Sequence, residues 1–342
     1  MQILLTNDDG IHAPGIKALA QTLQSLGNVT VVAPLTEQSG ISHALTFRTP
    51  LVVRQMTWDN GMKVWAVEGT PTDCTRIGVL NLCEQRPDLV ISGMNQGLNI
   101  GSNVIYSGTV AGAEEGATLG IDSFAVSLEY DEMPPWEKAT ELAIQVIRRI
   151  LEARITSYRA NLININVPIS ACYSTQQPEV RIVPVDQTPL SEAYTSRQGP
   201  HGVPYFWLTG RVQPSDPNLS TDRTMWKKGF VTVTPLEYNR TNRAAIEKLE
   251  LAFDTRLDVP PEELSEIEAN RLSEIIVRGQ ATKHPDSNEV RNDLYQPGIN
   301  QDHPSKTNRG NKANYNNLGT SIPPRSNPQG SNDAPPSYSE GT

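Results

Sequence analysis

The sequence has 342 residues, few of them cysteines, and no long apolar run. No stretch approaches the roughly 20 apolar residues of a membrane-spanning helix, so we expect no membrane partner. The first expected strand begins at residue 2, which leaves no room for a signal peptide. Cys74, Cys83 and Cys172 are too few for a disulfide framework and are typical of reduced thiols. These absences predict a soluble, cytoplasmic protein.

Positive charge is also scarce. There are 29 Lys and Arg residues against 38 Asp and Glu residues, a net charge of −9. This balance argues against a nucleic-acid polymer as the partner. The five histidines are scattered, and no pair of His or Cys residues has the spacing of a zinc site. Hydrophobic residues make up 37% of the chain, enough for a substantial core of one large domain or two.

The N-terminal half alternates between strand and helix patterns. Residues 2–5 are apolar, Ile16, Leu19, Ala20 and Leu23 follow helical spacing, and residues 29–33 are apolar again. This β-α-β order implies parallel strands with a right-handed crossover. Further strands are predicted at 88–91, 123–128 and 162–167, and helices at 110–117 and 136–154. We therefore expect an α/β fold with a Rossmann-like, mostly parallel sheet flanked by helices.

Two patterns qualify this picture. The polar and apolar residues of 162–167 alternate, which favours a strand near a sheet edge, while the small residues of 110–117 predict a helix packed very close to the sheet. In 170–240 Pro and Gly become frequent and short β-rich pieces appear at 180–185, 205–209 and 230–234. That composition suits β-hairpin extensions used for oligomerisation.

Helical spacing returns at 245–253 and 264–275, and the folded domain is expected to end near residue 280. Residues 281–342 contain ten asparagines and eight prolines and show no sustained periodicity. Such a segment buries too little apolar surface to offset its ordering entropy. We expect a disordered tail, dispensable for activity, after a single domain at 1–280.

Oxygen-bearing side chains follow three of the expected strands. Asp8 and Asp9 come after the first strand, Ser39 lies beyond the second, and Asn95 follows the strand at 88–91. In parallel sheets ligands gather at the carboxyl ends of strands where the strand order reverses. Two carboxylates, a hydroxyl and an amide suit Mg²⁺ or Mn²⁺, and Ca²⁺ also fits. A divalent ion would also remove the repulsion between adjacent carboxylates.

The segment 92–109 favours a phosphate site beside this metal site. It holds glycines at 93, 97 and 101, amides at Asn95 and Asn99, and hydroxyls at Ser107 and Thr109. Glycines let backbone N–H groups approach an anion, and the helix that follows adds its positive N-terminal end.

Several separated motifs resemble the SurE family, the survival-protein-E nucleotidases. The motifs are Leu5-Thr-Asn-Asp-Asp-Gly-Ile-His-Ala-Pro-Gly15, Ala33-Pro34 with Gln38-Ser-Gly40, Gly69-Thr-Pro-Thr-Asp-Cys74, Pro87-Asp-Leu-Val-Ile-Ser-Gly-Met-Asn-Gln-Gly97 with Ser107-Gly-Thr109, Ser220-Thr-Asp222, and Gly229-Phe-Val-Thr-Val-Thr-Pro-Leu236. They occur in the family's order and extend to about residue 255.

The resemblance implies a 5′-nucleotidase, a metal-dependent phosphatase of nucleoside 5′- and 3′-monophosphates, with short polyphosphate as a secondary substrate. By position it implies one metal ion per subunit held by Asp8, Asp9, Ser39 and Asn95. The phosphate-binding groups would be Asn99, Ser107, Gly108 and Thr109. It also implies homodimers formed through swapped C-terminal elements, sometimes paired into tetramers.

Alternatives to this chemistry remain open. Either Asp8 or Asp9 can accept a proton from the attacking water. A covalent aspartyl-phosphate route needs a second Asp two positions on, where the sequence has Gly10. A non-catalytic nucleotide sensor with a Rossmann-like sheet is the binding-class alternative, although Gly-x-Gly-x-x-Gly does not follow the first strand.

Other residues have ordinary structural explanations beside functional ones. We expect Asp73 to cap a helix, and His12 and His43 to be structural. Asp222 either helps to close the site or caps a turn. Trp65, Trp207 and Trp226 are expected in the core or in an interface.

Overall fold

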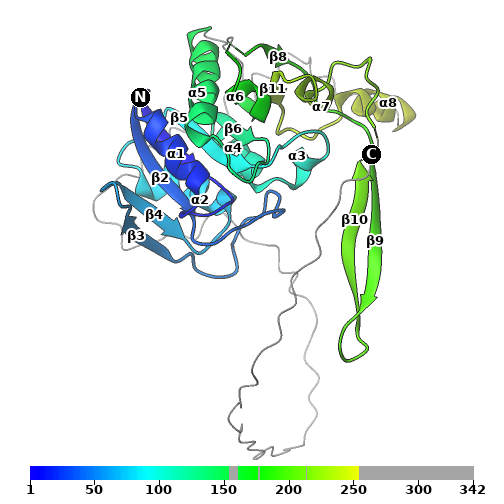
Figure 1. Cartoon of the computed structure of the whole chain (residues 1–342), viewed down its shortest axis with the longest axis horizontal. Coiled ribbons are helices and arrows are strands. Elements are labelled where there is room, and N and C mark those ends of the chain that lie inside the picture. The colour runs from blue at the N-terminus through cyan, green and yellow to red at the C-terminus, as the bar shows by residue number, and fades with distance from the viewer. Residues whose placement is uncertain (154–160, 176–177, 213, 254–342) are drawn as a thin grey trace, which may run out of the picture. The chain divides into compact units, whose positions relative to one another are not determined.

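The computed structural model describes residues 1–153, 161–175, 178–212 and 214–253 (Figure 1). Within them nine strands form one sheet in the order β3-β4-β2-β1-β5-β6-β7-β11-β8. Its strands are β1 (Gln2–Thr6), β2 (Asn28–Pro34), β3 (Val53–Thr57), β4 (Lys63–Val67), β5 (Leu89–Gln96), β6 (Asp122–Leu128), β7 (Leu162–Val167), β8 (Val180–Ile182) and β11 (Val231–Leu236). The predicted helix at 264–275 and the tail after 281 lie outside the described residues.

The central strands are parallel, as predicted. Strands β4, β2, β1, β5, β6 and β7 run in one direction, while β3 and β11 are antiparallel to their neighbours β4 and β7. Strand β1 lies between β2 and β5, so the strand order reverses at β1. The carboxyl ends of β1 and β5 are therefore the place where such a sheet binds ligands.

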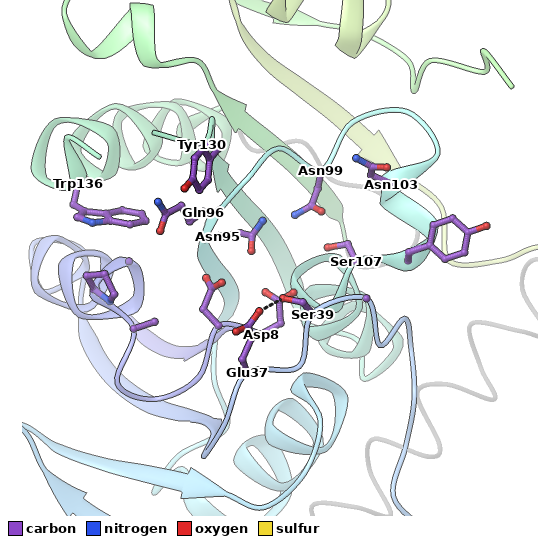
Figure 2. A pocket seen from close by; sticks show the side chains of 16 residues that line it. Asp8, Glu37, Ser39, Asn95, Gln96, Asn99, Asn103, Ser107, Tyr130 and Trp136 are labelled. Carbon is purple, nitrogen blue, oxygen red and sulfur yellow. Dashed lines mark hydrogen bonds between the residues drawn. The ribbon is translucent and has the colours of Figure 1, made fainter. Parts of the chain in front are cut away.

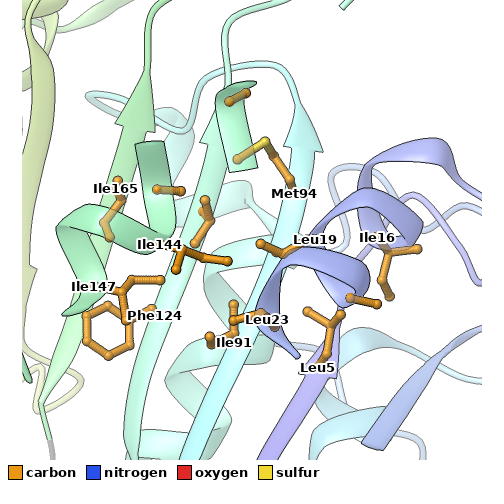
Figure 3. Close-up of a cluster of buried hydrophobic side chains, with 14 of the residues drawn as sticks. Leu5, Ile16, Leu19, Leu23, Ile91, Met94, Phe124, Ile144, Ile147 and Ile165 are labelled. Carbon is orange, nitrogen blue, oxygen red and sulfur yellow. The ribbon is translucent and has the colours of Figure 1, made fainter. Parts of the chain in front are cut away.

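Helices cover both faces of the sheet (Figure 1). Apolar residues of α1 (Pro14–Leu23) and α5 (Trp136–Glu152) join one core cluster, with Ile3, Leu5 and Ile91 from the strands (Figure 3). On the opposite face α2 (Pro71–Ile77), with the π-helix η1 (Gly78–Leu82), and α4 (Gly108–Thr118) cover the alternate strand residues, such as Leu4 and Val90. This two-sided burial explains why residues 3–5 of β1 and 89–91 of β5 are apolar without alternation.

Helix α4 packs very close to the sheet, as its small residues predict. A Cβ atom at Gly112 would lie 2.9 Å from Ser92 Oγ, and one at Gly116 would lie 2.7 Å from Val90 Cβ. Any larger residue would push the helix away from β5. The contact fixes the N-terminal end of α4 beside the carboxyl ends of β1 and β5.

Strand β5 is longer than the apolar run that predicted it. It continues through the polar residues to Gln96, past a shift in its pairing with β6 between Ser92 and Asn95. Gly93 has a φ of +141°, and a Cβ there would lie 2.3 Å from the Val126 carbonyl oxygen. The predicted end of this strand at residue 91 was wrong, because the bulge lets the strand continue and carry Asn95 to the ligand-binding edge.

Strand β7 is an interior strand, so the edge position predicted for 162–167 was wrong. It pairs with β6 on one side and β11 on the other, and every residue in it is buried. Its alternating polar residues, Asn164 and Asn166, bind a neighbouring loop instead of water.

The region 170–240 divides between the main sheet and a hairpin. Strands β9 (Leu190–Gln198) and β10 (Pro204–Val212) form the expected antiparallel hairpin, whereas β8 and β11 belong to the main sheet. Short helices α3 (Asn103–Tyr106), α6 (Ile169–Cys172) and α7 (Asp222–Trp226) lie in loops, and α8 (Arg243–Phe253) confirms the helix predicted at 245–253. None of the described helices is long and apolar enough to cross a membrane.

Candidate active site

A cleft of about 590 Å³ opens at the carboxyl ends of β1 and β5 (Figure 2). Six of the residues proposed from the sequence line it: Asp8, Asp9, Ser39, Asn95, Asn99 and Ser107. The other two, Gly108 and Thr109, form the first turn of α4 directly against Asp8. The structure thus brings the proposed metal and phosphate residues together.

Asp8 is held from two sides. Its Oδ1 accepts a 2.5 Å hydrogen bond from the Thr109 hydroxyl, and its carbonyl oxygen accepts one from the Gln38 N–H at 2.7 Å. A Cβ at Gly108 would lie 2.8 Å from the Asp8 Cβ, so only glycine permits this approach. The contacts fix the Asp8 carboxylate beside the positive end of α4.

The two carboxylates are electrostatically strained without a cation. Burial raises the pKa of Asp8, although the Thr109 hydrogen bond opposes that shift. Burial and then the charge of Asp8 raise the pKa of Asp9 to about 7, and Glu37 adds further repulsion. A positive ion beside them would relieve this strain.

The available donors suit a hard cation. The Ser39 hydroxyl donates to Glu37 Oε1 at 2.7 Å, and the Asn95 amide nitrogen donates to the Gly97 carbonyl at 2.6 Å. Among the described residues no three His, Cys, Asp or Glu side chains gather as a metal cluster. The candidate donors that line the cleft are two carboxylates, a hydroxyl and an amide. Such oxygen donors suit Mg²⁺ or Mn²⁺ better than zinc.

The phosphate-binding candidates lie around the start of α4 and the loop that precedes it. Ser107 is the N-cap of α4, and its hydroxyl oxygen accepts the Val110 N–H at 3.0 Å. In Figure 2 Ser107 and Asn99 lie on the same side of the cleft. This wall combines an amide, a hydroxyl and a helix N-terminus, which together bind anions.

Asn99 is fixed by a buried amide network that the sequence reading missed. Its N–H donates to Asn166 Oδ1 at 2.8 Å, and its carbonyl accepts from Asn164 Nδ2 at 2.7 Å. The Asn99 side-chain nitrogen donates to the Ser127 hydroxyl at 2.8 Å. The available signal was the alternation of polar residues in 162–167, which we had assigned to a sheet edge.

Asp222 anchors the same loop from α7. Its Oδ2 accepts the Gly101 N–H at 2.8 Å and its Oδ1 accepts the Asp186 N–H at 2.9 Å. It is fully buried and does not line the cleft. Asp222 therefore holds the phosphate-side loop in place and takes no direct part in the cleft.

Asp73 and His43 make structural contacts, as expected, and none of the other weighed residues lines the described cleft. Asp73 completes a capping box with Thr70, the N-cap of α2. The His43 ring lies 2.9 Å from Glu115 Oε2 on α4, and His12 is exposed outside the cleft. Cys74 is fully buried and does not line the cleft, and burial raises the pKa of its thiol, so it is not placed to act as a nucleophile there.

Several cleft residues had not been singled out. They are Ala13, Pro14, Gly15, Glu37, Gly40, Gln96, Asn103, Tyr106, Tyr130 and Trp136. Glu37 precedes Ser39 by two residues, and Gln96 follows Asn95, so their positions in the motifs were visible. Tyr130 and Trp136 lie beyond β6, where no motif pointed to them.

Comparisons with known proteins show the family of this chain. The family model described as Survival protein SurE matches residues 3–196. A protein named 5′-nucleotidase SurE from Rhodopirellula baltica is 46% identical over 242 residues, covering 70% of this chain and 94% of that protein. The chain belongs to the SurE family.

Two further matches extend along most of the described chain. The 5′-nucleotidase SurE of Caldanaerobacter subterraneus is 36% identical over 248 residues, which cover 72% of this chain and 95% of that one. The crystal structure of the SurE protein from Aquifex aeolicus superposes with a TM-score of 0.62 at 33% identity, covering 74% of this chain and 99% of its own. The predicted family and fold class are confirmed.

His43 links the Ser39 segment of this SurE protein to α4, and its charge generates a pH prediction. Its contacts with Glu114 and Glu115 raise its pKa from 6.5 to about 9. A raised folded-state pKa stabilises the fold below about pH 6.5, and this stabilisation is lost as the pH rises through about 9. We expect His43→Ala to lower the free energy of unfolding by roughly 2 kcal/mol at pH 6 and by much less at pH 10.

Urea titrations at both pH values measure this difference. His201→Ala, at an exposed position in the turn between β9 and β10, is the matched control and should change stability little at either pH. An equal loss for His43→Ala at pH 6 and pH 10 would contradict the ion-pair explanation.

Proposed function

We propose that this SurE protein is a 5′-nucleotidase that hydrolyses nucleoside 5′-monophosphates to nucleoside and phosphate. The observation that supports this is the meeting of the buried Asp8 and half-buried Asp9 carboxylates with the N-terminal end of α4 in one cleft. Its relatives in Rhodopirellula baltica and Caldanaerobacter subterraneus are named for the same activity. We extend the proposal to 3′-monophosphates and, as a secondary substrate, to short polyphosphate.

We further propose that the activity depends on one divalent cation per subunit, Mg²⁺ or Mn²⁺, with Ca²⁺ as another candidate. Asp8, Asp9, Ser39 and Asn95 would hold it, since their oxygen donors all line the cleft. When bound, the cation supplies positive charge against the phosphoryl oxygens and offsets the repulsion of the carboxylates.

The protein side chains have distinct tasks in this proposal. Asn99, Ser107 and the first turn of α4 bind the phosphoryl group, and the buried network around Asn99 keeps its amide in place. The Asp8 carboxylate already accepts a hydrogen bond from the Thr109 hydroxyl, whereas Asp9 is less buried than Asp8 and lines the cleft. We therefore assign to Asp9 the acceptance of the proton from the attacking water.

A nucleotide sensor without turnover explains this site less well. Asp8, Asp9 and Glu37 would repel a phosphate ligand, and no Lys, Arg or His among the described residues lines the cleft to offset them. A binding protein gains nothing from that arrangement, whereas a phosphatase needs a cation and a proton acceptor there.

Phosphate release from AMP distinguishes an enzyme from a sensor and tests the metal. The metal-stripped protein should release no phosphate, and added Mg²⁺ or Mn²⁺ should restore activity, because no cationic side chain of the described cleft can replace the ion. Colorimetric phosphate assays with and without EDTA measure this. Full activity in EDTA would refute the metal site, and no activity with any divalent ion would favour the sensor.

Asp8→Asn should separate activity from stability. We expect kcat/KM for AMP to fall at least a hundredfold, about 3 kcal/mol of transition-state stabilisation, because a ligand charge is lost. The asparagine oxygen can still accept from Thr109, and removing a buried carboxylate with a raised pKa relieves strain. The melting temperature of the metal-free protein should therefore stay the same or rise.

Asp59→Asn, at an exposed position between β3 and β4, is the control and should leave activity unchanged. If Asp8→Asn keeps wild-type activity or fails to fold, Asp8 is not a metal ligand of the kind proposed.

We propose a homodimer or tetramer, with residues 170–260 forming most of the contact. The support is the apolar exposure of the hairpin: the exposed fractions are 69% for Tyr194, 59% for Phe206 and 62% for Trp207. Aromatic residues on an isolated hairpin are better buried against another subunit.

We also propose that the protein is cytoplasmic. Its three cysteines are all free thiols, which supports this placement.

Light scattering should give at least a dimeric mass for the full chain and for a chain ending at Gln280. The double variant Phe206→Ser and Trp207→Ser should form a weaker oligomer, which dissociates at protein concentrations where wild type stays associated. Met133→Ser is the control: Met133 is 84% exposed but lies outside the hairpin, so its substitution should not weaken the oligomer. A monomeric full chain would refute the assembly, and a monomer only after truncation would assign the contact to the tail.

A further inference from the structure

The cleft extends beyond the groups that bind a phosphate. Figure 2 shows Trp136, Tyr130 and Gln96 at one end and Asn99, Asn103 and Ser107 at the other. Its volume of about 590 Å³ lies in the range that holds a whole small-molecule ligand. The first end has no role in the metal and phosphate chemistry described above.

Trp136 is a fixed wall of that end. It starts α5 and is half-buried at the edge of the core that α1 and α5 share. A Cβ at Gly15 would lie 3.0 Å from its Cζ3 and 3.1 Å from its Cη2, so the ring packs directly on the α1 backbone. A rigid aromatic surface of this kind binds a flat ligand with little loss of conformational entropy.

Tyr130 stands beside it as an exposed aromatic. Its exposed fraction is 68%, although it lines a cleft at the binding edge of the sheet. Gln96 adds a directed polar group, because its Nε2 donates to the Asp131 carbonyl at 2.8 Å. Among the residues that the structure describes, none donates to its Oε1, which leaves an acceptor for a ligand N–H.

The charges of the cleft favour a neutral group over a second phosphate at this end. Asp8, Asp9 and Glu37 are negative, and within the described chain no cationic side chain lines the cleft. A flat, neutral and aromatic group with an N–H donor fits this end instead.

We propose that Tyr130 and Trp136 form the subsite for the nucleobase, which stacks on them while Gln96 Oε1 accepts a hydrogen bond from an exocyclic amino group. The inference rests on the proposed nucleotidase function and names the part of the substrate that sets its selectivity. Stacking is available to every base, so several nucleotides are accepted. The acceptor at Gln96 gives bases with an amino group, such as adenine, an advantage over hypoxanthine.

Tyr130→Ala and Trp136→Leu test the stacking, with AMP compared to ribose 5-phosphate, which lacks the base. Each variant should raise KM for AMP about tenfold with kcat nearly unchanged, and should leave kcat/KM for ribose 5-phosphate as in wild type. Tyr173→Ala, a 61% exposed tyrosine outside the cleft, is the matched control and should change neither substrate.

Gln96→Met tests the hydrogen bond. Wild type should prefer AMP to IMP by several-fold in kcat/KM, and the variant should lose that preference while still accepting both. An unchanged preference would overturn the role of Gln96.

The remaining outcomes are equally decisive. Equal losses on AMP and ribose 5-phosphate would show that the aromatic residues support the phosphate site or the fold, and no change on either would show that they bind nothing; both overturn the subsite. If wild type hydrolyses no phosphomonoester, calorimetric titration with adenosine tests the nucleobase subsite independently of catalysis. Binding that Tyr130→Ala abolishes would keep the subsite although the proposed catalysis fails, and no binding would overturn both.

Discussion

The contact between α4 and the sheet is the constraint on which the site depends. Gly112 and Gly116 let the helix lie against β5, and Gly108 lets its first turn touch Asp8. The Thr109 hydroxyl then reaches the Asp8 carboxylate. A helix displaced by the width of one methyl group would separate the anion-binding end of α4 from the carboxylates. The small residues of this helix therefore serve the site as well as the packing.

Negative charge is concentrated in the cleft beside the start of α4. The strand order reverses at β1, so Asp8 and Asp9 lie where sheets of this kind bind ligands, and Glu37 lines the same cleft. Their raised pKa values are the physical cost of burying carboxylates that no side chain of the described cleft neutralises. The fold tolerates this cost because the surrounding sheet is well packed, a common compromise between stability and function. In the proposed mechanism, positive charge comes from the helix end and from the divalent cation.

The parts of the site that were predictable from the sequence are those encoded in one short segment. The turn after β1 and the glycine-rich segment after β5 each show their chemistry locally, and the strand order follows from the β-α-β rule. Asn164 was misinterpreted because alternation of polar and apolar residues is the same whether the polar face meets water or a buried amide network. Tyr130 and Asp222 could not be assigned, since their roles depend on contacts with segments distant in sequence.

Those distant contacts decide how much of the chain the site requires. The family model ends at residue 196, yet Asp222 holds the Gly101 N–H and Asn166 holds the Asn99 N–H. Strand β11 pairs with β7 at Asn164 and Asn166. It therefore holds in place the strand whose asparagines bind the Asn99 backbone. Removing β11 would expose a β7 edge and let these amides exchange their partners for water. The proposed metal residues come from the first half of the chain, whereas the proposed phosphate residue Asn99 also depends on contacts with α7 and β11. We therefore expect a catalytic unit that reaches at least residue 236.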